Sequence, residues 1–262
     1  MIYHERKFIE LANILYHKGW IHFEKLDPGW TMQYNGDEQI FAIIIRTLIC
    51  NDNSSKRFYS DINGFQGVKE HYTSEDELEE WLRINLKNYL LGTGKGSHRD
   101  NRHKLSTPRT IRKYLDLTEP SQTEFLGKVV DFHDLVTQLE SVYYIGSLTA
   151  FDISKRLIEA ELLNHLPQHF YLTGTGEIKG LQALYPTISG KKKLREMGEQ
   201  LMNKILEQTK IPSELAYFGI EDLLCIYQKD KRFKDFLECS ISVEKYASYM
   251  LDRKCVLERG VC

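Results

Sequence analysis

The chain has 262 residues, of which 42% are apolar and 11% aromatic, enough to bury one large core or two lobes that share an interface. Its formal net charge of −2 excludes a surface that is basic throughout, although nucleic-acid binding requires only a local basic patch. No apolar run reaches the roughly 18 residues that a membrane span needs. Residues 1–7 lack the apolar core of a signal peptide, so we expect a cytoplasmic protein without membrane contact.

The five cysteines are scattered along the chain and lack the close pairs that iron–sulfur clusters use. No histidine follows His169, so a zinc site built from the C-terminal cysteines would be incomplete. We therefore expect reduced thiols, no bound metal and no cofactor.

Helical periodicity runs through most of the chain, and no segment alternates like a β-strand. We predict an all-α fold in which residues 1–262 form one two-lobed unit, with the lobe boundary near residues 115–130. The most apolar predicted helix, residues 40–50, should be buried nearly all round. Arg46 is its only charged residue, so it needs a buried carboxylate or a polar cavity beside it.

Small polar residues, from Asn51 to Ser55, follow this apolar helix directly. Such side chains cap helices and form turns. They could equally form the floor of a polar pocket, with Asp52 as an acid. Both interpretations stay open at this point.

Residues 92–113 carry seven Lys or Arg residues against one acid, Asp100. The glycines in this stretch do not follow the order of a Walker-type phosphate loop, which we therefore reject. A basic loop that contacts a nucleic-acid backbone through Lys95, Arg99 and Arg102 is one hypothesis. A solvated loop without a partner is the other.

The pattern of residues 135–163 predicts a helix, a tight turn and a second helix. We expect Gly146 to adopt the positive φ that such a turn needs. The backbone N–H groups from Ile145 through Gly146 and Ser147 to Thr149 would then suit a phosphate oxygen. An ordinary corner between two helices is the alternative.

A second glycine-rich helix entrance lies at residues 170–184, which contain Gly174, Gly176 and Gly180. Glu177 and Lys179 stand at its mouth. A purely structural turn is the alternative here.

The order of these parts resembles the helix-hairpin-helix DNA glycosylase superfamily. Within it, residues 145–153, 174–181 and 221–229 are similar to motifs of the α-glutamyl/putrescinyl thymine pyrophosphorylase-like family, which is associated with hypermodified bases of phage DNA. The resemblance covers roughly residues 38–230. It implies a DNA glycosylase that cleaves the N-glycosidic bond of a modified pyrimidine, for example one carrying a sugar, in double-stranded phage DNA.

Three positions depart from the glycosylase pattern. Tyr144 stands where these hairpins usually have a glycine, so the turn must close differently. Leu148 replaces the lysine that forms a Schiff base in bifunctional members, which implies a monofunctional enzyme that leaves an intact abasic site. No acid is found near Gly174 or Thr175, where the superfamily has its catalytic aspartate.

Loss of the base builds positive charge on the sugar, and a nearby carboxylate can stabilise that charge or activate water. Glu177 and Asp52 are the candidate catalytic acids. We expect the base to be extruded into a cleft between the lobes. The side chains expected to bind it are Arg46, Asn51, Thr175 and Lys179.

The resemblance implies defence of a host against modified phage DNA, and we expect a monomer. Two alternatives remain. One is a transferase that installs an adduct on activated 5-hydroxymethyluracil, and the other is a DNA-binding module without an active site. Loss of turnover in Glu177→Gln and Asp52→Asn, with DNA affinity retained, would distinguish an enzyme from a binding module.

Overall fold

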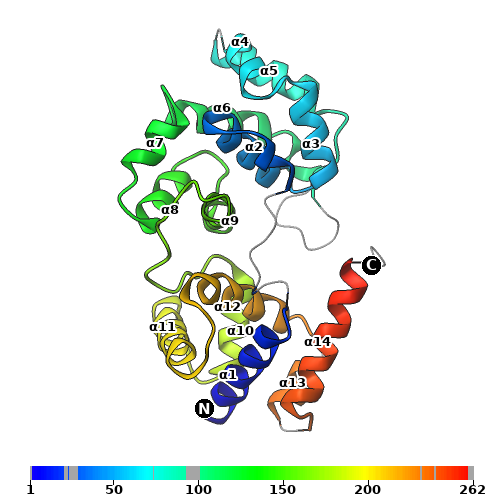
Figure 1. Cartoon of the computed structure of the whole chain (residues 1–262), viewed down its shortest axis with the longest axis vertical. Coiled ribbons are helices and arrows are strands. Elements are labelled where there is room, and N and C mark those ends of the chain that lie inside the picture. The colour runs from blue at the N-terminus through cyan, green and yellow to red at the C-terminus, as the bar shows by residue number, and fades with distance from the viewer. Residues whose placement is uncertain are drawn as a thin grey trace. The chain divides into compact units, whose positions relative to one another are not determined.

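The computed structural model describes residues 2–20, 23, 29–72, 74–92, 101–230, 232–238 and 240–258. All regular secondary structure in these residues is helical, which confirms the all-α prediction (Figure 1). In this described part of the chain, no helix combines the length and apolar character needed to cross a membrane.

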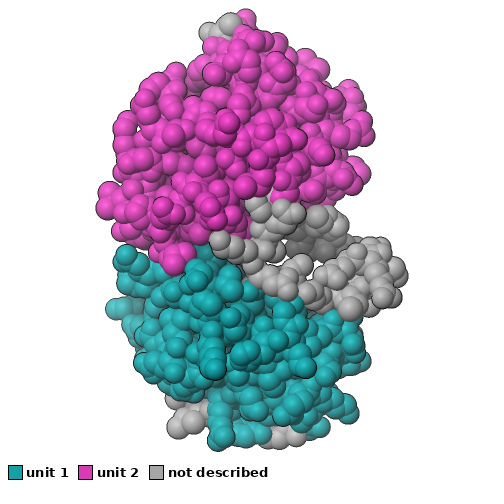
Figure 2. Space-filling model, viewed as in Figure 1, with its two compact units in different colours: residues 1–26, 167–262 teal, residues 27–166 magenta. Residues whose placement is uncertain are grey.

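The chain forms two compact units (Figure 2). Unit 1 comprises Met1–Leu26 and Pro167–Cys262, and unit 2 comprises Asp27–Leu166. The division therefore falls at residues 26/27 and 166/167, whereas the sequence analysis placed it near residues 115–130. Those residues lie inside unit 2, because the helices at residues 107–117 and 122–128 both pack against the central helix of that unit.

The central helix of unit 2 is α2 (Gly36–Ile49). Its side chains from Ile40 to Ile45 are fully buried, as predicted from their apolar run. The elements that contact α2 are η2 (Gly29–Gln33), α3 (Asp52–Asp61), α4 (Gly64–His71), α6 (Thr107–Leu117), α7 (Gln122–Lys128) and α9 (Ser147–Glu159). The remaining elements of the unit are α5 (Glu75–Leu86), η3 (Asn101–Lys104) and α8 (Phe132–Glu140).

Asp37 ties the first turn of α2 to the first turn of α7. Its Oδ1 accepts hydrogen bonds from the backbone N–H of Thr123 at 2.8 Å, the Thr123 hydroxyl at 2.6 Å and the Ser121 hydroxyl at 3.0 Å. Burial by itself would raise the pKa of Asp37, but these bonds to the ionised form outweigh it and hold the pKa below its usual value. The carboxylate thus fixes the start of α7 against α2.

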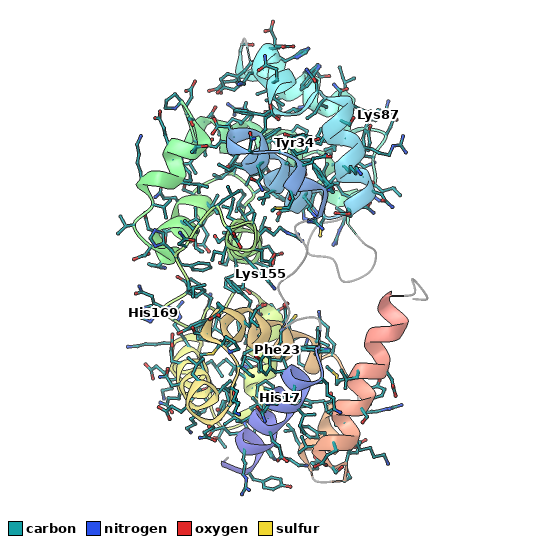
Figure 3. All side chains as sticks on the ribbon, in the orientation of Figure 1. His17, Phe23, Tyr34, Lys87, Lys155 and His169 are labelled. Carbon is teal, nitrogen blue, oxygen red and sulfur yellow. The ribbon has the colours of Figure 1, made fainter. Side chains whose placement is uncertain are left out.

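Unit 1 joins the N-terminal helix α1 (Ile2–His17) to the C-terminal part of the chain. Phe8 and Leu11 of α1 lie in one hydrophobic core with side chains of the later helices. Phe23, labelled in Figure 3, packs against Trp20 with 5.8 Å between ring centroids. The other helices of this unit are α10 (Thr175–Leu184), α11 (Lys191–Gln208), α12 (Ser213–Tyr227), α13 (Phe233–Leu237) and α14 (Val243–Glu258).

Helices α10 and α12 approach closely because two glycines of α10 face α12. A Cβ atom on Gly176 would lie 2.4 Å from Sγ of Cys225, and one on Gly180 would lie 2.6 Å from the carbonyl oxygen of Leu224. Both distances are far inside van der Waals contact. Any larger residue at these positions would push the two helices apart.

Gly180→Ala should therefore lower the free energy of unfolding by about 1–3 kcal/mol, the usual cost of overpacking. This result would run against helix propensity, which favours alanine by about 0.5–1 kcal/mol. Gly127 of α7 is the matched control, since a Cβ there meets no atom within 4 Å. Gly127→Ala should be neutral or stabilising in urea denaturation, and an equal response of the two variants would contradict the close packing.

Candidate functional site

The turn between α8 and α9 has a backbone different from the one expected. Tyr144 adopts the left-handed conformation, with φ of 65°. Gly146 has φ −94° and ψ 173°, which is extended backbone, so the prediction that Gly146 takes the positive φ is wrong. Tyr144 closes the turn in this conformation at some steric cost, because it carries a Cβ atom.

Gly146 is instead the N-cap of α9, and no side chain caps this helix end. A Cβ atom on Gly146 would meet no atom within 4 Å, so the space in front of the first turn is open. Ser147 is half-buried, whereas Ile145 and Thr149 are buried. The two buried side chains anchor the turn, and the backbone at Gly146 and Ser147 stays open to a ligand.

Aromatic and basic side chains surround this helix end. The guanidinium of Arg109 lies 4.6 Å from the ring centroid of Tyr143, and the rings of His103 and Tyr144 meet edge to face at 6.1 Å. Tyr143, Tyr144, Arg109 and Arg102 are all exposed. We call the surface formed by Arg102, Arg109, Tyr143, Tyr144 and Gly146 the turn surface.

The turn surface contains part of the predicted basic loop. Arg102 belongs to η3 and directly precedes His103, whose ring meets that of Tyr144 in the turn. Lys95 and Arg99 lie outside the described residues. Exposed cations, aromatic faces and an uncapped helix N-terminus are the features that bind a phosphate backbone and unpaired bases. The sequence signal for the aromatic part is the pair of consecutive tyrosines in the turn, Tyr143 and Tyr144.

Asn51 serves as the N-cap of α3. Of the two interpretations of the small polar residues 51–55, this one is helix capping. Its Oδ1 accepts from the N–H of Ser54 at 3.0 Å, and its Nδ2 donates to the carbonyl of Gly92 at 3.1 Å. The N–H of Leu91 donates to Oδ1 of Asn101 at 3.0 Å. These bonds tie Gly92 to the start of α3 and Leu91 to Asn101.

Arg46 pairs with Asp52, since Nε and Oδ1 are 2.8 Å apart. The Asp52 side chain is 58% exposed and that of Arg46 is 17% exposed. The cation of the apolar helix thus reaches a carboxylate at the surface, not a buried one. A polar hollow of about 570 Å³ does lie on α3, but its lining begins at Asn53, with Ser54, Arg57 and Asp61. Neither Asn51 nor Asp52 lines it.

Glu177 lies in unit 1 beside a second acid that sequence reasoning missed. Glu177 is 1% exposed and Glu221 of α12 is 5% exposed. The Thr173 hydroxyl contacts Oε1 of Glu177 and lies 2.9 Å from Oε1 of Glu221. The Thr173 hydroxyl thus lies within hydrogen-bond distance of both carboxyl groups and can direct its single hydrogen toward either of them. The carboxyl groups of Glu177 and Glu221, which are joined through the Thr173 hydroxyl, are called the acid pair below.

The carboxylate of Glu177 folds back over the start of α10. Its Oε2 accepts from the N–H of Gly174 at 3.1 Å and lies 3.3 Å from the position of a Cβ on Gly174. Gly174 is the N-cap of α10. A carboxylate thus lies beside Gly174, although it belongs to Glu177, three residues later in the chain.

The other predicted residues of α10 do not share this environment. Thr175 and Lys179 are exposed and stand four residues apart, so they lie on the outer face of the helix, opposite Glu177. Cys225 lies close to Glu177 on the buried face. Burial raises the pKa of the Cys225 thiol, Lys229 opposes the rise, and the charge of Glu177 adds to it.

Comparisons with protein-family models, with curated proteins and with solved structures give no match. Among the described residues, no group of three His, Cys, Asp or Glu side chains is placed to hold a metal ion. Cys50 and Cys225 are free thiols. The turn surface in unit 2 and the acid pair in unit 1 are thus the two features on which a function can be argued.

Proposed function

We propose that this protein is a monofunctional DNA glycosylase that hydrolyses the N-glycosidic bond of a modified pyrimidine in double-stranded DNA. The observation that carries the proposal is the acid pair, because two buried carboxyl groups joined through one hydroxyl are rare without a chemical role. The resemblance of the hairpin, the glycine turn and residues 221–229 to a family associated with modified phage DNA supports the choice of substrate. Defence against such DNA is the biological role that follows.

In this proposal the acid pair performs the chemistry. One carboxyl group is ionised and accepts a proton from water as the water oxygen bonds to C1′ of the sugar. The bond between C1′ and the base nitrogen breaks, and its electron pair leaves with the base. The neutral carboxyl group can protonate the departing base. Leu148 stands at the place of the Schiff-base lysine, so the abasic sugar stays intact.

The turn surface supplies the DNA contacts in this proposal. A phosphate at the N-terminus of α9 would receive hydrogen bonds from backbone N–H groups and the favourable end of the helix dipole. Arg102 and Arg109 add positive charge, and the exposed rings of Tyr143 and Tyr144 can stack on a base left unpaired by extrusion. Phosphate contacts would offset the few kcal/mol that base extrusion costs.

The test is direct incubation of the purified protein with unmodified DNA, with DNA containing 5-hydroxymethylpyrimidines and with DNA containing glucosylated 5-hydroxymethylcytosine. Abasic sites are counted with an aldehyde-reactive probe, and released bases are identified by mass spectrometry. We expect abasic sites and free base in equal amounts on one modified DNA without any added cofactor. Absence of both products on every modified DNA would refute the proposal.

A DNA-binding module without catalysis is the second candidate, and the burial of the acid pair favours it. Glu177 and Glu221 are both at least 95% buried, and hydrogen bonds within unit 1 hold Glu177 in place. In that case the acids stabilise the contact of α10 with α12 and nothing more. Tight DNA binding without base release would identify this alternative.

A further inference from the structure

The polar hollow on α3 belongs to neither feature of the proposed function. It lies between one face of α3 and the C-terminal end of α5 with the turn that follows, and its volume is about 570 Å³. Helix α3 lines it with Asn53, Ser54, Arg57 and Asp61, whose spacing places them on the same side of the helix. The volume is in the range of roughly 300–1,000 Å³ that is usual for small-molecule sites.

Three polar side chains of the hollow are open to a ligand. Arg57, Asn53 and Asn88 line it and are exposed. Among the described residues, none of these three side chains has a hydrogen bond or an ion pair. A guanidinium only donates hydrogen bonds, whereas a carboxamide both donates and accepts. The hollow therefore offers donors and acceptors that no part of the described chain uses.

Tyr89 and Asp61 form a fixed part of the wall. The Tyr89 hydroxyl donates to Oδ2 of Asp61, and the Tyr89 ring meets the buried ring of Phe58 edge to face at 5.4 Å. Burial raises the pKa of Tyr89, and the bond to Asp61 adds to the rise, so the hydroxyl stays protonated at neutral pH. Asp61 and Arg57 are the charged residues of the lining, and their formal charges cancel.

Apolar side chains complete the hollow. Ile84 is 63% exposed and Leu90 is 60% exposed, and both belong to the lining. Exposed apolar groups beside free polar groups are typical of binding sites for ligands that have both kinds of surface.

A ring that carries several hydroxyl groups matches these properties together. A hydroxyl both donates and accepts, so it can bond to a guanidinium, a carboxylate or a carboxamide, and the carbon face of the ring can pack on Ile84 and Leu90. A phosphate group matches less well, because Asp61 repels it. We propose that the polar hollow binds a hexose unit, either free or attached to a DNA base. Binding of a free sugar is independent of glycosylase activity, whereas recognition of a sugar on DNA rests on the proposed function.

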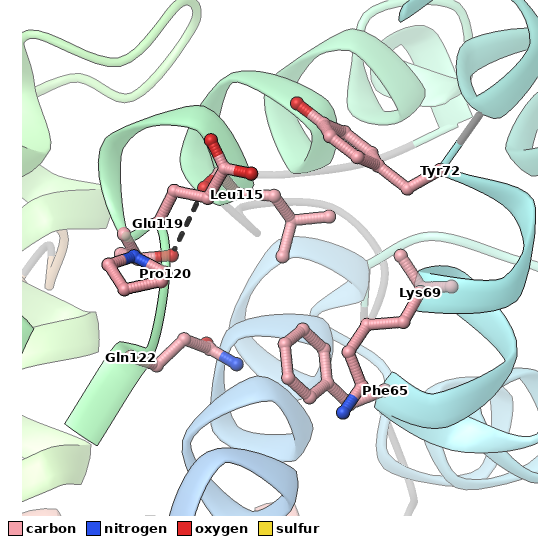
Figure 4. Close-up of a pocket in the computed structure, with 9 residues that line it drawn as sticks. Phe65, Lys69, Tyr72, Leu115, Glu119, Pro120 and Gln122 are labelled. Carbon is pink, nitrogen blue, oxygen red and sulfur yellow. Dashed lines mark hydrogen bonds between the residues drawn. The ribbon is translucent and has the colours of Figure 1, made fainter. Parts of the chain in front are cut away.

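The test uses the full chain and the methyl glycosides of glucose, galactose and mannose, each beside its per-O-methylated form, which has no hydroxyl group. Binding is followed through the methyl resonances of Ile84 and Leu90. Val68 and Leu115, which line a smaller pocket between α4, α6 and α7 (Figure 4), are the controls. We expect at least one glycoside to shift only the hollow resonances and to bind at least about tenfold more tightly than its per-O-methylated form.

Arg57→Met should weaken glycoside binding by a similar factor, because methionine cannot donate a hydrogen bond. The variant should fold as the unaltered protein does, since the Arg57 side chain has no hydrogen bond or ion pair to lose among the described residues. Lys56→Met is the matched control. Lys56 is also an exposed cation of α3, but it does not line the hollow.

DNA that contains glucosylated 5-hydroxymethylcytosine distinguishes the two sources of the sugar. Competition of this DNA with the free glycoside, and weaker binding of the DNA by Arg57→Met, would identify a sugar on DNA, whereas glycoside binding without competition would identify a free sugar. The proposal is overturned by equal binding of a glycoside and its per-O-methylated form, by unchanged glycoside binding in Arg57→Met, by tighter binding of inorganic phosphate than of any glycoside, or by no shift of the hollow resonances. Absence of base release with glycoside binding retained would refute the glycosylase proposal alone.

Discussion

Glu177→Gln should lower the rate of base release by a factor of about 10²–10⁴, the range that general acid–base catalysis contributes, with DNA affinity unchanged. Glutamine has the same shape and can still accept the hydrogen bond from the N–H of Gly174, so α10 should keep its start. It cannot take a proton from water or stabilise charge on the sugar. The measurement is the single-turnover rate of abasic-site formation beside the dissociation constant for the same DNA.

Glu5 provides the matched control for this variant. It is also a buried acid of unit 1, and it accepts from the Tyr185 hydroxyl at 2.8 Å and from Nζ of Lys204 at 2.6 Å. Glu5→Gln should lower stability without changing the rate per folded molecule. Glu221→Gln should slow base release as well if the two acids act together.

A wild-type rate in Glu177→Gln would rule out the acid pair as the catalytic group. Asp52→Asn then becomes the decisive variant, since Asp52 is the other predicted acid. Its side chain pairs with Arg46 and is 58% exposed, an arrangement that suits charge stabilisation more than proton donation. Full activity in both variants would refute the assignment of Glu177 and that of Asp52 as the catalytic acid.

Gly146→Asp should weaken DNA binding by about tenfold or more while stabilising the protein. Aspartate is a favoured N-cap residue, and the extended backbone and open space at Gly146 accommodate it. Its carboxylate would accept hydrogen bonds from the first turn of α9 and repel a phosphate from the same groups. DNA affinity is measured by fluorescence anisotropy at several salt concentrations, and stability by thermal denaturation.

Gly146→Asn separates charge from size. Asparagine caps a helix about as well as aspartate and has the same shape, but it carries no charge. We expect an intermediate DNA affinity, since the amide occupies the space of a phosphate oxygen without repelling it. If Gly146→Asp binds DNA as the unaltered protein does, the N-terminus of α9 is not a phosphate site, and DNA must be bound elsewhere.

Several local features could be predicted because they depend on neighbouring residues. The run of apolar residues at 40–45 requires burial wherever the helix packs, and it is buried. Ser74 and Glu77 stand at the spacing of a capping box, and the Ser74 hydroxyl accepts from the N–H of Glu77 at 3.3 Å. The two consecutive helices at residues 135–163 were predicted from periodicity and turn residues, and α8 and α9 occupy that range.

The conformation of the turn could not be predicted in the same way. Gly146 has the lower steric cost at positive φ, so local propensity favours it. The structure places the left-handed residue at Tyr144, with Ile145 buried and the Tyr144 ring against His103. Packing of the turn against the rest of unit 2 outweighs the preference of Gly146 for positive φ.

The sequence by itself determined that this protein is all-helical and that the apolar helix at residues 40–50 is buried nearly all round. Only the tertiary structure decided that α1 shares a core with the C-terminal helices, that Arg46 pairs with Asp52, and that Glu177 meets Glu221 through Thr173, a residue 48 positions from Glu221. The physical reason is range. Helix formation, capping and amphipathicity act between residues a few positions apart, whereas the partner of a buried charge depends on which distant helices pack together.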